Sequence, residues 1–221
     1  MTKKLVSMSV YGTDPMYVKG ALLNADLVHD VFPGWTLRIY YARAEVDPQP
    51  FRDRGCETVA QARSRIHSGM FWRFLAAWDT EAERVIFRDS DSRLNIREAA
   101  AVRAWEESGL NAHCMKDHPH HAQLPMLGGM WGIRCGILPT SLLEEVKQMI
   151  RRPQRRILDM RWLMNRVHPL IEGSLLRHSS VETSWPSVPF PEHPPYDGFC
   201  GQQYDADGNG IWPGGRAKCG R

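Results

Sequence analysis

Cysteine is scarce in this sequence, and the thiols that are present form no recognisable set. The 221 residues contain five cysteines, none of them in a C-x-x-C pair. An odd number of scattered thiols signals neither a disulfide framework nor a cysteine-ligated zinc site. We therefore expect a soluble, cytoplasmic protein from a reducing compartment.

Long apolar stretches, internal repeats and a strong charge of one sign are missing as well. No run approaches the roughly 18 apolar residues that a membrane-spanning helix needs, so stable membrane insertion is not expected. The absence of a repeat argues against a solenoid or propeller. The formal net charge of +3 is too small to make nucleic acid the expected partner, although it leaves anionic small molecules open.

The chain does have enough apolar material for a core. Hydrophobic residues make up 43% of it and aromatic residues 10%, which suits one domain of this length. We expect a single domain over residues 1–221. Proline and glycine accumulate from Pro186 onward, so the part from about residue 186 is predicted to be an irregular tail draped over the surface.

Strand-like and helical segments alternate through the first half. The predicted strands are "LVSMSVYG", "TLRIYYA", "CETVA" and "ERVIFRD", and the predicted helices begin at Asp14-Pro15, at "SGMFWRF" and at Asn95. Asn95 and Glu98 have the spacing of a capping box, and Gly109 is placed to end that helix. Two further helices are expected around residues 142–150 and 157–171. The alternation predicts an α/β fold with a mixed, mainly parallel sheet flanked by helices.

Two aspartates follow the most apolar of these strands, in the segment "FRDSDSRL". At a strand end, residues i and i+2 point the same way, so Asp89 and Asp91 are expected to face the crevice above the carboxyl edge of the sheet. Two hard oxygen donors suit Mg²⁺ or Mn²⁺. The alternative is a strand end with solvated charges, because D-x-D is frequent by chance. The position after a buried strand favours the metal site.

Two other segments carry groups that suggest chemistry. The histidine-rich segment "HCMKDHPHH" lacks the thiolates or the helical i, i+4 pair that would indicate zinc. The segment "RRPQRRILDMRWLMNR" has six arginines in sixteen residues. It suits a nucleic-acid face or the steering of an anionic substrate, but we favour a solvated helix face with Leu158, Trp162 and Leu163 turned inward.

The segment "FRDSDSRL", preceded by "GMFWRF" and followed by "HCMKDHPHH" and "GGMWG", resembles small glycosyltransferases of the GT-A, nucleotide-diphospho-sugar transferase type, including those encoded by chlorella viruses. The resemblance extends from about "SVYG" to about "GFCGQQYD". It implies a GT-A fold and transfer of a sugar from a nucleoside-diphosphate donor, a UDP-sugar, to a glycan or other hydroxyl acceptor. It also implies Mn²⁺ or Mg²⁺ as the cofactor.

The resemblance assigns the metal ligands residue by residue. Asp91 is the expected direct ligand, and Asp89 binds the ion or the ribose hydroxyls, with Ser90 between them beside the donor. His178, in "LRHSS", is the expected late metal ligand. The sequence departs from the family pattern here, because an aspartate usually follows this histidine and the chain has Ser179.

The resemblance also places residues on the donor. Tyr11 and Gly12 are expected against the nucleoside. Trp72 and Arg73 are expected beside the donor, with Arg73 neutralising phosphate as a catalytic group. For Trp72 the alternative is an aromatic residue of the core.

A third set is expected near the transferred sugar. Asp117 and His118 are predicted to hydrogen-bond its hydroxyls. Gly128 and Gly129 are predicted to let backbone approach it closely, with an ordinary turn as the alternative. Asp159 is the expected catalytic carboxylate, although Met160 replaces a glutamine of the family pattern, and a structural role for Asp159 in its helix remains the alternative.

Two other function classes remain open from the sequence. Phosphatases with an aspartate nucleophile also use D-x-D after a strand, but on the first strand, whereas here the motif follows about the fourth. A basic, non-enzymatic module for anionic polymers is the second alternative.

Overall fold

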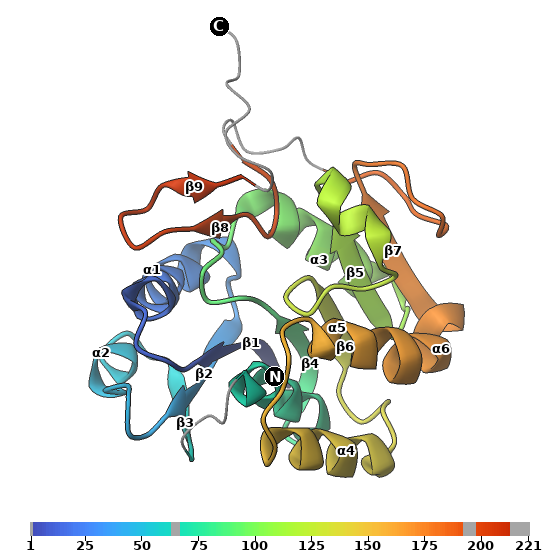
Figure 1. Cartoon of the computed structure of the whole chain (residues 1–221). Coiled ribbons are helices and arrows are strands. Elements are labelled where there is room, and N and C mark those ends of the chain that lie inside the picture. The colour runs from blue at the N-terminus through green and yellow to red at the C-terminus, as the bar shows by residue number, and fades with distance from the viewer. Residues whose placement is uncertain (1, 63–66, 192–197, 213–221) are drawn as a thin grey trace, which may run out of the picture.

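Seven strands form one mixed sheet in the computed structural model, which describes residues 2–62, 67–191 and 198–212. The order across the sheet is β3-β2-β1-β4-β6-β5-β7 (Figure 1). The strands are β1 (Lys3–Val10), β2 (Trp35–Ala42), β3 (Glu57–Gln61), β4 (Ala82–Phe87), β5 (Ala112–Lys116), β6 (Trp131–Arg134) and β7 (Leu175–Ser179). Strand β6 is antiparallel to both of its neighbours, β4 and β5, and the other pairings are parallel. The mixed, mainly parallel sheet predicted from the sequence is confirmed.

The helices lie between the strands. They are α1 (Pro15–Val31), α2 (Gln49–Arg52), α3 (Ile96–Ser108), α4 (Thr140–Ile150), α5 (Leu158–Trp162) and α6 (His168–Ile171), with the 3₁₀ helices η1 (Ser68–Trp78), η2 (Pro119–Gln123) and η4 (Glu172–Ser174) and the π-helix η3 (Leu163–Val167). The predicted capping box of α3 is present, and Gly109 ends this helix with φ of 73°. Within the described ranges, no helix is both long and apolar enough to cross a membrane.

The chain beyond residue 186 is more regular near its end than expected. Strands β8 (Gln203–Tyr204) and β9 (Gly210–Ile211) pair in antiparallel fashion. This hairpin is hydrogen-bonded to the main sheet's carboxyl edge, because the Tyr204 N–H donates to the Asp91 carbonyl at 2.8 Å. Residues 203–211 thus contribute to the same edge at which the sequence predicts a ligand site.

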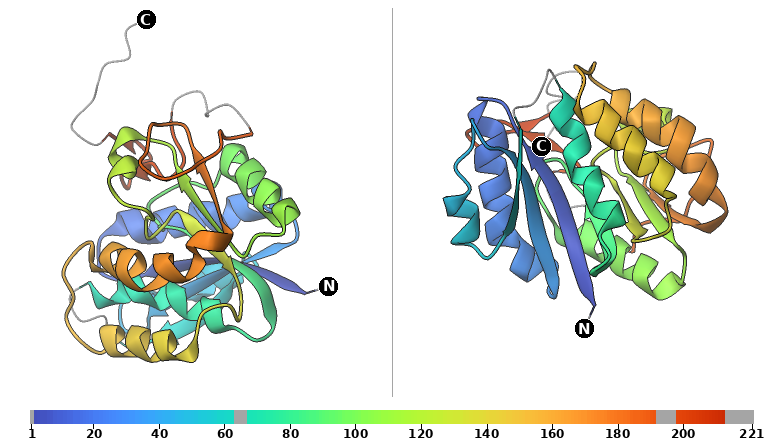
Figure 2. Two further views of the ribbon diagram at one scale, coloured as in Figure 1. Left: turned by 90° about the vertical axis from the view of Figure 1, so that its right-hand side faces the viewer. Right: turned by 90° about the horizontal axis from the view of Figure 1, so that it is seen from below.

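Helices cover both faces of the sheet (Figure 2). Helices α1, α2 and α3 pack on one face, and η1, α4 and the α5–α6 region pack on the other. Strand β4 shows why both faces are apolar: Val85 and Phe87 belong to the cluster under η1, whereas Ile86 belongs to the cluster under α1 and α3. Alternation of side chains along a strand covered on both sides produces this pattern.

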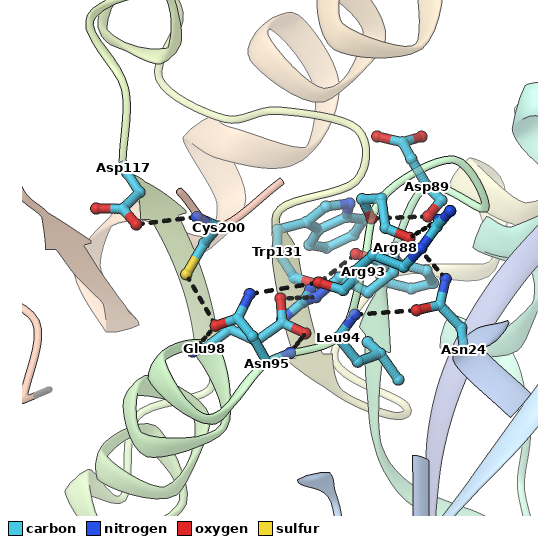
Figure 3. Close-up of polar contacts among 12 residues, drawn as sticks. Asn24, Arg88, Asp89, Arg93, Leu94, Asn95, Glu98, Asp117, Trp131 and Cys200 are labelled. Carbon is cyan, nitrogen blue, oxygen red and sulfur yellow. Dashed lines mark hydrogen bonds and ion pairs between the residues drawn. The ribbon is translucent and has the colours of Figure 1, made fainter. Parts of the chain in front are cut away.

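A buried ion pair connects the end of β4 to the start of α3. Arg88 Nε donates to Glu98 Oε2 at 3.1 Å, and the two side chains are 1% and 2% exposed. Arg88 also donates to the carbonyls of Phe87 at 2.8 Å and Trp131 at 3.3 Å. Figure 3 shows the Asp89 carboxylate pointing away from this pair. The first arginine of "FRDSDSRL" is therefore turned into the protein, while the aspartate after it is turned out.

We predict that Glu98→Gln destabilises the protein by about 3–5 kcal/mol, because it leaves the Arg88 charge buried without a counter-charge. Glutamine keeps the side-chain oxygen that serves the capping box, so the change isolates the charge. Denaturant unfolding measures the effect. Glu144→Gln, which breaks an exposed pair with Lys147 on α4, is the matched control and should cost less than about 0.5 kcal/mol. Equal costs for the two variants would contradict a structural role for the buried pair.

Two histidines form a second buried polar contact, between β5 and β7. His113 Nε2 and His178 Nδ1 are joined by a hydrogen bond of 2.9 Å, and both residues are almost fully buried. Burial lowers the pKa of His178 to about 4 and the pKa of His113 well below its usual value. Both rings are consequently neutral in the folded protein at neutral pH.

This pair predicts a pH dependence of stability. The unfolded chain takes up protons on both imidazoles below about pH 6.5, while the folded protein does not, so the free energy of unfolding falls as pH drops from about 6.5 toward 4. The slope is up to about 1.4 kcal/mol per pH unit for each imidazole. Denaturant unfolding across this range should show a shallower slope for His178→Gln than for wild type. An unchanged slope in His178→Gln would contradict the assignment of this pH dependence to the buried pair.

Candidate functional site

A pocket of about 940 Å³ opens at the carboxyl edge of β1 and β4. Its walls come from the ends of these strands, from η1, α1 and α5, and from the C-terminal hairpin. Ligands of open α/β sheets bind at this kind of edge. The predicted site residues that line it are Tyr11, Gly12, Arg73, Asp89, Ser90, Asp91 and Asp159.

Strand β1 positions Arg73 through two serines. Ser7 Oγ donates to the Arg73 carbonyl at 2.8 Å, and the Arg73 N–H donates to Ser9 Oγ at 3.0 Å. Ser7 and Ser9 share one face of β1 because alternate residues of a strand point the same way. Small hydroxyl side chains thus replace apolar ones here and fix η1 against the sheet in one register.

The Arg73 guanidinium lies between two carboxylates. It forms an ion pair with Asp89 and a second one with Asp159 Oδ2 at 3.1 Å, and it also donates to the Arg88 carbonyl at 3.2 Å. Arg73 is only 4% exposed. Burial opposes its charge, but the charges of Asp89 and Asp159 outweigh burial and raise the pKa of Arg73. The three side chains form one charged row across the floor of the pocket.

Two glycines leave room for this row. A side chain at Gly128 would collide with Asp159 and Arg73, and one at Gly129 would collide with Asp89. Both glycines lie just before β6, where the chain passes directly under the carboxylates. They support the charged groups from behind and do not themselves line the pocket.

Asp91 lies beside Asp89 but has different partners. Its Oδ2 accepts from Gln203 Nε2 of the C-terminal hairpin at 2.7 Å. Burial, followed by the negative charge of Asp89, raises the pKa of Asp91 to about 6. A carboxylate whose ionisation is disfavoured by a neighbouring negative charge is the electrostatic setting that a bound cation relieves.

The residues present fit a divalent ion that is only partly held by protein. Asp89 and Asp91 supply hard oxygen ligands, which suit Mg²⁺ or Mn²⁺ ions that keep waters or phosphate oxygens in their remaining positions. Within the described residues, no group of three or more His, Cys, Asp or Glu side chains is arranged to hold a metal ion. A protein cage for the ion is therefore not part of this arrangement.

The structure does not bring His178 to the two aspartates. Strand β7 is separated from β4 by β6 and β5, a distance of about 14 Å at the usual spacing of strands. The His178 ring is hydrogen-bonded to His113 and buried. In this arrangement its imidazole has a structural contact and does not reach the ion that Asp89 and Asp91 would share.

The two aromatic residues that the sequence predicts beside a donor are arranged in two layers. Tyr11 lines the pocket, and its ring lies so close to Gly69 that a side chain there would collide with it. Trp72 is 1% exposed and packs edge-on against Tyr11, with 5.6 Å between the ring centroids. Trp72 thus supports Tyr11 from the core, which matches the alternative interpretation of this residue. Gly12, with φ of 83°, donates its N–H to Glu45 Oε2 at 2.8 Å.

Asp117 and His118 lie behind the pocket wall. Asp117 accepts two hydrogen bonds from Arg97, at 3.0 and 2.9 Å, and one from the Cys200 N–H at 2.9 Å, the last of which is drawn in Figure 3. His118 caps η2 and stacks on Phe199. The residue of this segment that does line the pocket is His121.

Several pocket residues were not predicted from the sequence. They include Tyr17, Glu45, His121, Arg156, Ile157 and Gln203. Arg156 belongs to the arginine-rich segment, in which Trp162 and Leu163 are buried as expected. Ile157 is in the left-handed region with φ of 66°, which is costly for a β-branched residue, and directly precedes α5. Contacts between distant segments bring these residues to the pocket, and no local pattern indicates them.

Comparisons with known proteins identify the fold. No protein-family model matches the sequence, and no curated protein matches it significantly. In structure, the chain is similar to a glycosyltransferase involved in glycosylation of the major capsid of PBCV-1, with 13% identity, a TM-score of 0.51, and coverage of 80% of this chain and 81% of that one. It is also similar to glucosyl-3-phosphoglycerate synthase from Mycobacterium tuberculosis in complex with Mn²⁺ and uridine-diphosphate-glucose. That similarity has 14% identity, a TM-score of 0.50, and coverage of 89% and 73%. The chain therefore has the GT-A-like fold of nucleotide-diphospho-sugar transferases.

Proposed function

We propose that the protein is a metal-dependent glycosyltransferase that moves a sugar from a nucleoside-diphosphate donor, a UDP-sugar, to a hydroxyl group of a glycan or another acceptor. One observation carries the proposal: Asp91 and the charged row of Asp89, Arg73 and Asp159 face a large pocket at the carboxyl edge of a GT-A-like sheet. The M. tuberculosis structure with Mn²⁺ and uridine-diphosphate-glucose supports a donor and a metal of these kinds.

Asp89 and Asp91 would hold Mn²⁺ or Mg²⁺ against the diphosphate. When bound, the ion supplies positive charge that stabilises the departing diphosphate. The chain's own contribution is to fix the two carboxylates. Arg73 holds one oxygen of Asp89, and Gln203 holds one oxygen of Asp91, so one oxygen of each carboxylate remains for the ion.

Arg73 has a supporting electrostatic role in this proposal. Its guanidinium is buried and already aligned by two carboxylates, so it needs no reorganisation when charge develops on the diphosphate. In many enzymes, prealigned charge in a buried site makes the largest single contribution to the rate enhancement, because it stabilises the transition state. Because both of its pairs are with site carboxylates, Arg73 also fixes the distance between the metal end and the Asp159 end of the site.

Asp159 is the proposed carboxylate at the sugar end. It lines the pocket, is 7% exposed, and accepts from the Met160 N–H at 2.9 Å in addition to Arg73. In an inverting transfer this carboxylate would take the proton of the acceptor hydroxyl, and in a retaining transfer it would contact the sugar. Burial raises the pKa of Asp159, and the Arg73 charge opposes that change. Burial and Arg73 together therefore set the basicity of this carboxylate.

In this proposal the donor lies along the carboxyl edge of the sheet. Tyr11, Gly12, Glu45 and Tyr17 surround the pocket on the β1–β2 side and are the proposed nucleoside contacts. The diphosphate follows at the end of β4, and the sugar lies toward the Asp159 end. Gly128 and Gly129 leave room for the carboxylates of Asp159 and Asp89. Asp117 and His118 act indirectly, because they hold Cys200 and Phe199 of the pocket wall in place.

The two rival functions have less support in the geometry. A phosphatase would need a free aspartate nucleophile, whereas the Asp89 carboxylate is paired with Arg73. A polymer-binding module would use the exposed arginines of the arginine-rich segment, of which Arg156 lines the pocket. Phosphate release from uridine diphosphate, and salt titration of polyanion binding, distinguish these functions from sugar transfer.

We predict that uridine diphosphate binds only with Mn²⁺ or Mg²⁺ and that Asp91→Asn weakens this binding at least tenfold, or about 1.4 kcal/mol. Without a cation, the carboxylates repel the diphosphate. Calorimetry with metal and with chelator measures the effect. Asp26→Asn, which neutralises an exposed carboxylate paired with Arg54, is the matched control and should bind as wild type. Equal affinity in the presence of chelator would rule out the metal site.

We predict that Asp159→Asn lowers sugar transfer on the order of 100-fold while donor affinity stays nearly unchanged. Asparagine keeps the size and the hydrogen bond to backbone but cannot take a proton. Turnover of a UDP-sugar and calorimetry of donor binding are measured together, and the melting temperature shows whether the fold is kept. Wild-type turnover would assign Asp159 to structure, whereas loss of donor affinity would make it a sugar contact.

A further inference from the structure

Two rings, His121 and Phe199, line one side of the pocket, and His118 and Trp212 pack against Phe199; we call these four rings the aromatic wall. His118 stacks on Phe199 with 4.4 Å between the ring centroids and 28° between the planes. Trp212 meets Phe199 at 5.6 Å and His121 meets it at 5.5 Å, both nearly edge-on. Phe199 and His121 face the pocket, and Trp212 is half-buried beside them.

The chain segment that carries Phe199 and Trp212 is held in place by contacts that their rings do not make. The Cys200 N–H is bound by the buried carboxylate of Asp117, and Gly201, with φ of 79°, packs directly on Met130. Gln203 and Tyr204 are hydrogen-bonded to Asp91. Backbone contacts thus fix the segment that carries Phe199 and Trp212. A large ring at the pocket surface is not required for this anchoring.

The wall lies away from the proposed nucleoside end. His118 and His121 follow β5, which is two strands beyond β4 in the sheet, whereas Tyr11 and Glu45 follow β1 and β2 on the other side of β4. The pocket, at about 940 Å³, is near the upper end of the usual range for a small-molecule site. A donor that occupies the β1–β4 half leaves the side of the aromatic wall for a second substrate.

The wall is also uncharged. The arginines that line the pocket are Arg73, which is paired with two carboxylates, and Arg156, which interacts with Tyr17 of α1 at the nucleoside end. Burial lowers the pKa of His121 to about 4 and also lowers the pKa of His118, so these rings are neutral at neutral pH. Among the residues that the structure describes, this wall presents no cation to a negatively charged acceptor.

The chemistry of such a wall suits a sugar ring. The negative face of an aromatic ring attracts the weakly positive C–H groups on the flat side of a pyranose. His121 adds a directional contact: its Nδ1 accepts from the Asp117 N–H at 3.2 Å, so in the neutral ring the proton is on Nε2, which can donate to a hydroxyl oxygen. Stacking plus a neutral donor distinguishes a pyranose from a phosphate.

We propose that the aromatic wall is the acceptor subsite and that the acceptor is a neutral glycan, whose pyranose ring packs on Phe199, which Trp212 supports edge-on, with a hydroxyl hydrogen-bonded to His121. The inference rests on the proposed function, since it names the second substrate of the same site. In this proposal the exposed arginines of the arginine-rich segment do not bind the acceptor.

Saturation-transfer difference NMR on the full chain tests the inference. The probes are methyl β-D-glucopyranoside, methyl α-D-mannopyranoside and methyl β-D-galactopyranoside, with methyl β-D-glucuronide as the charged comparison, each with and without Mn²⁺ and uridine diphosphate. At least one neutral glycoside should receive saturation on its ring C–H protons. Phe199→Leu and Trp212→Leu should reduce that signal at least fivefold with nucleotide affinity changed less than twofold. Trp185→Leu removes a ring that packs on Lys116 outside the pocket and should leave the signal unchanged.

The outcomes separate this inference from the proposed function. Wild-type signals in both Phe199→Leu and Trp212→Leu, no signal from any neutral glycoside, or a stronger signal from the glucuronide would each overturn the neutral acceptor subsite. Nucleotide binding by calorimetry is scored independently. If the protein binds nucleotide with metal but the variants lose no glycoside signal, the proposed function stands and this inference is overturned. A protein that binds glycosides at the wall but no nucleotide loses the proposed transfer.

Discussion

The buried guanidinium of Arg73 is the constraint on which the rest of the site depends. A charge that is almost completely removed from water must be compensated, and Asp89 and Asp159 do this from two different parts of the chain. The end of β4, helix η1 and the start of α5 are consequently fixed relative to one another. Ser7 and Ser9 of β1 fix the backbone of the same residue, so the position of the charge is set from both directions.

The segment "FRDSDSRL" is explained by alternation of its side chains. Phe87 lies in the core under η1, Arg88 turns toward Glu98, and Asp89 turns into the pocket. The Ser90 carbonyl packs on Gly20 of α1, where a larger residue would collide with it, and Asp91 again faces the pocket. Two carboxylates and an arginine follow a buried strand because the arginine ties the strand to α3, while the two carboxylates line the pocket.

Local patterns were sufficient to predict the sheet class and most of the helix starts. The capping box of Asn95 and Glu98 depends on neighbouring residues, and the pair Asp89 and Asp91 depends only on a strand end, so both follow from the sequence. The antiparallel strand β6 was not predicted as a strand, because its direction depends on pairing with β4 and β5. Gln203 and His121 reach the pocket through contacts over long sequence separations, which no spacing rule records. The placement of His178 beside His113 has the same origin.

The hydrogen bond between Gln203 and Asp91 has a consequence for biosynthesis. It joins a residue near the end of the described chain to a carboxylate in its first half. A ribosome releases the β1–β4 part of the sheet long before the hairpin that completes the pocket, and domains acquire their native contacts as their sequence emerges. The growing polypeptide therefore carries the acidic pair exposed and without its amide partner until translation has passed residue 203. The wall of the pocket that contains Gln203 therefore forms only after this residue has left the ribosome.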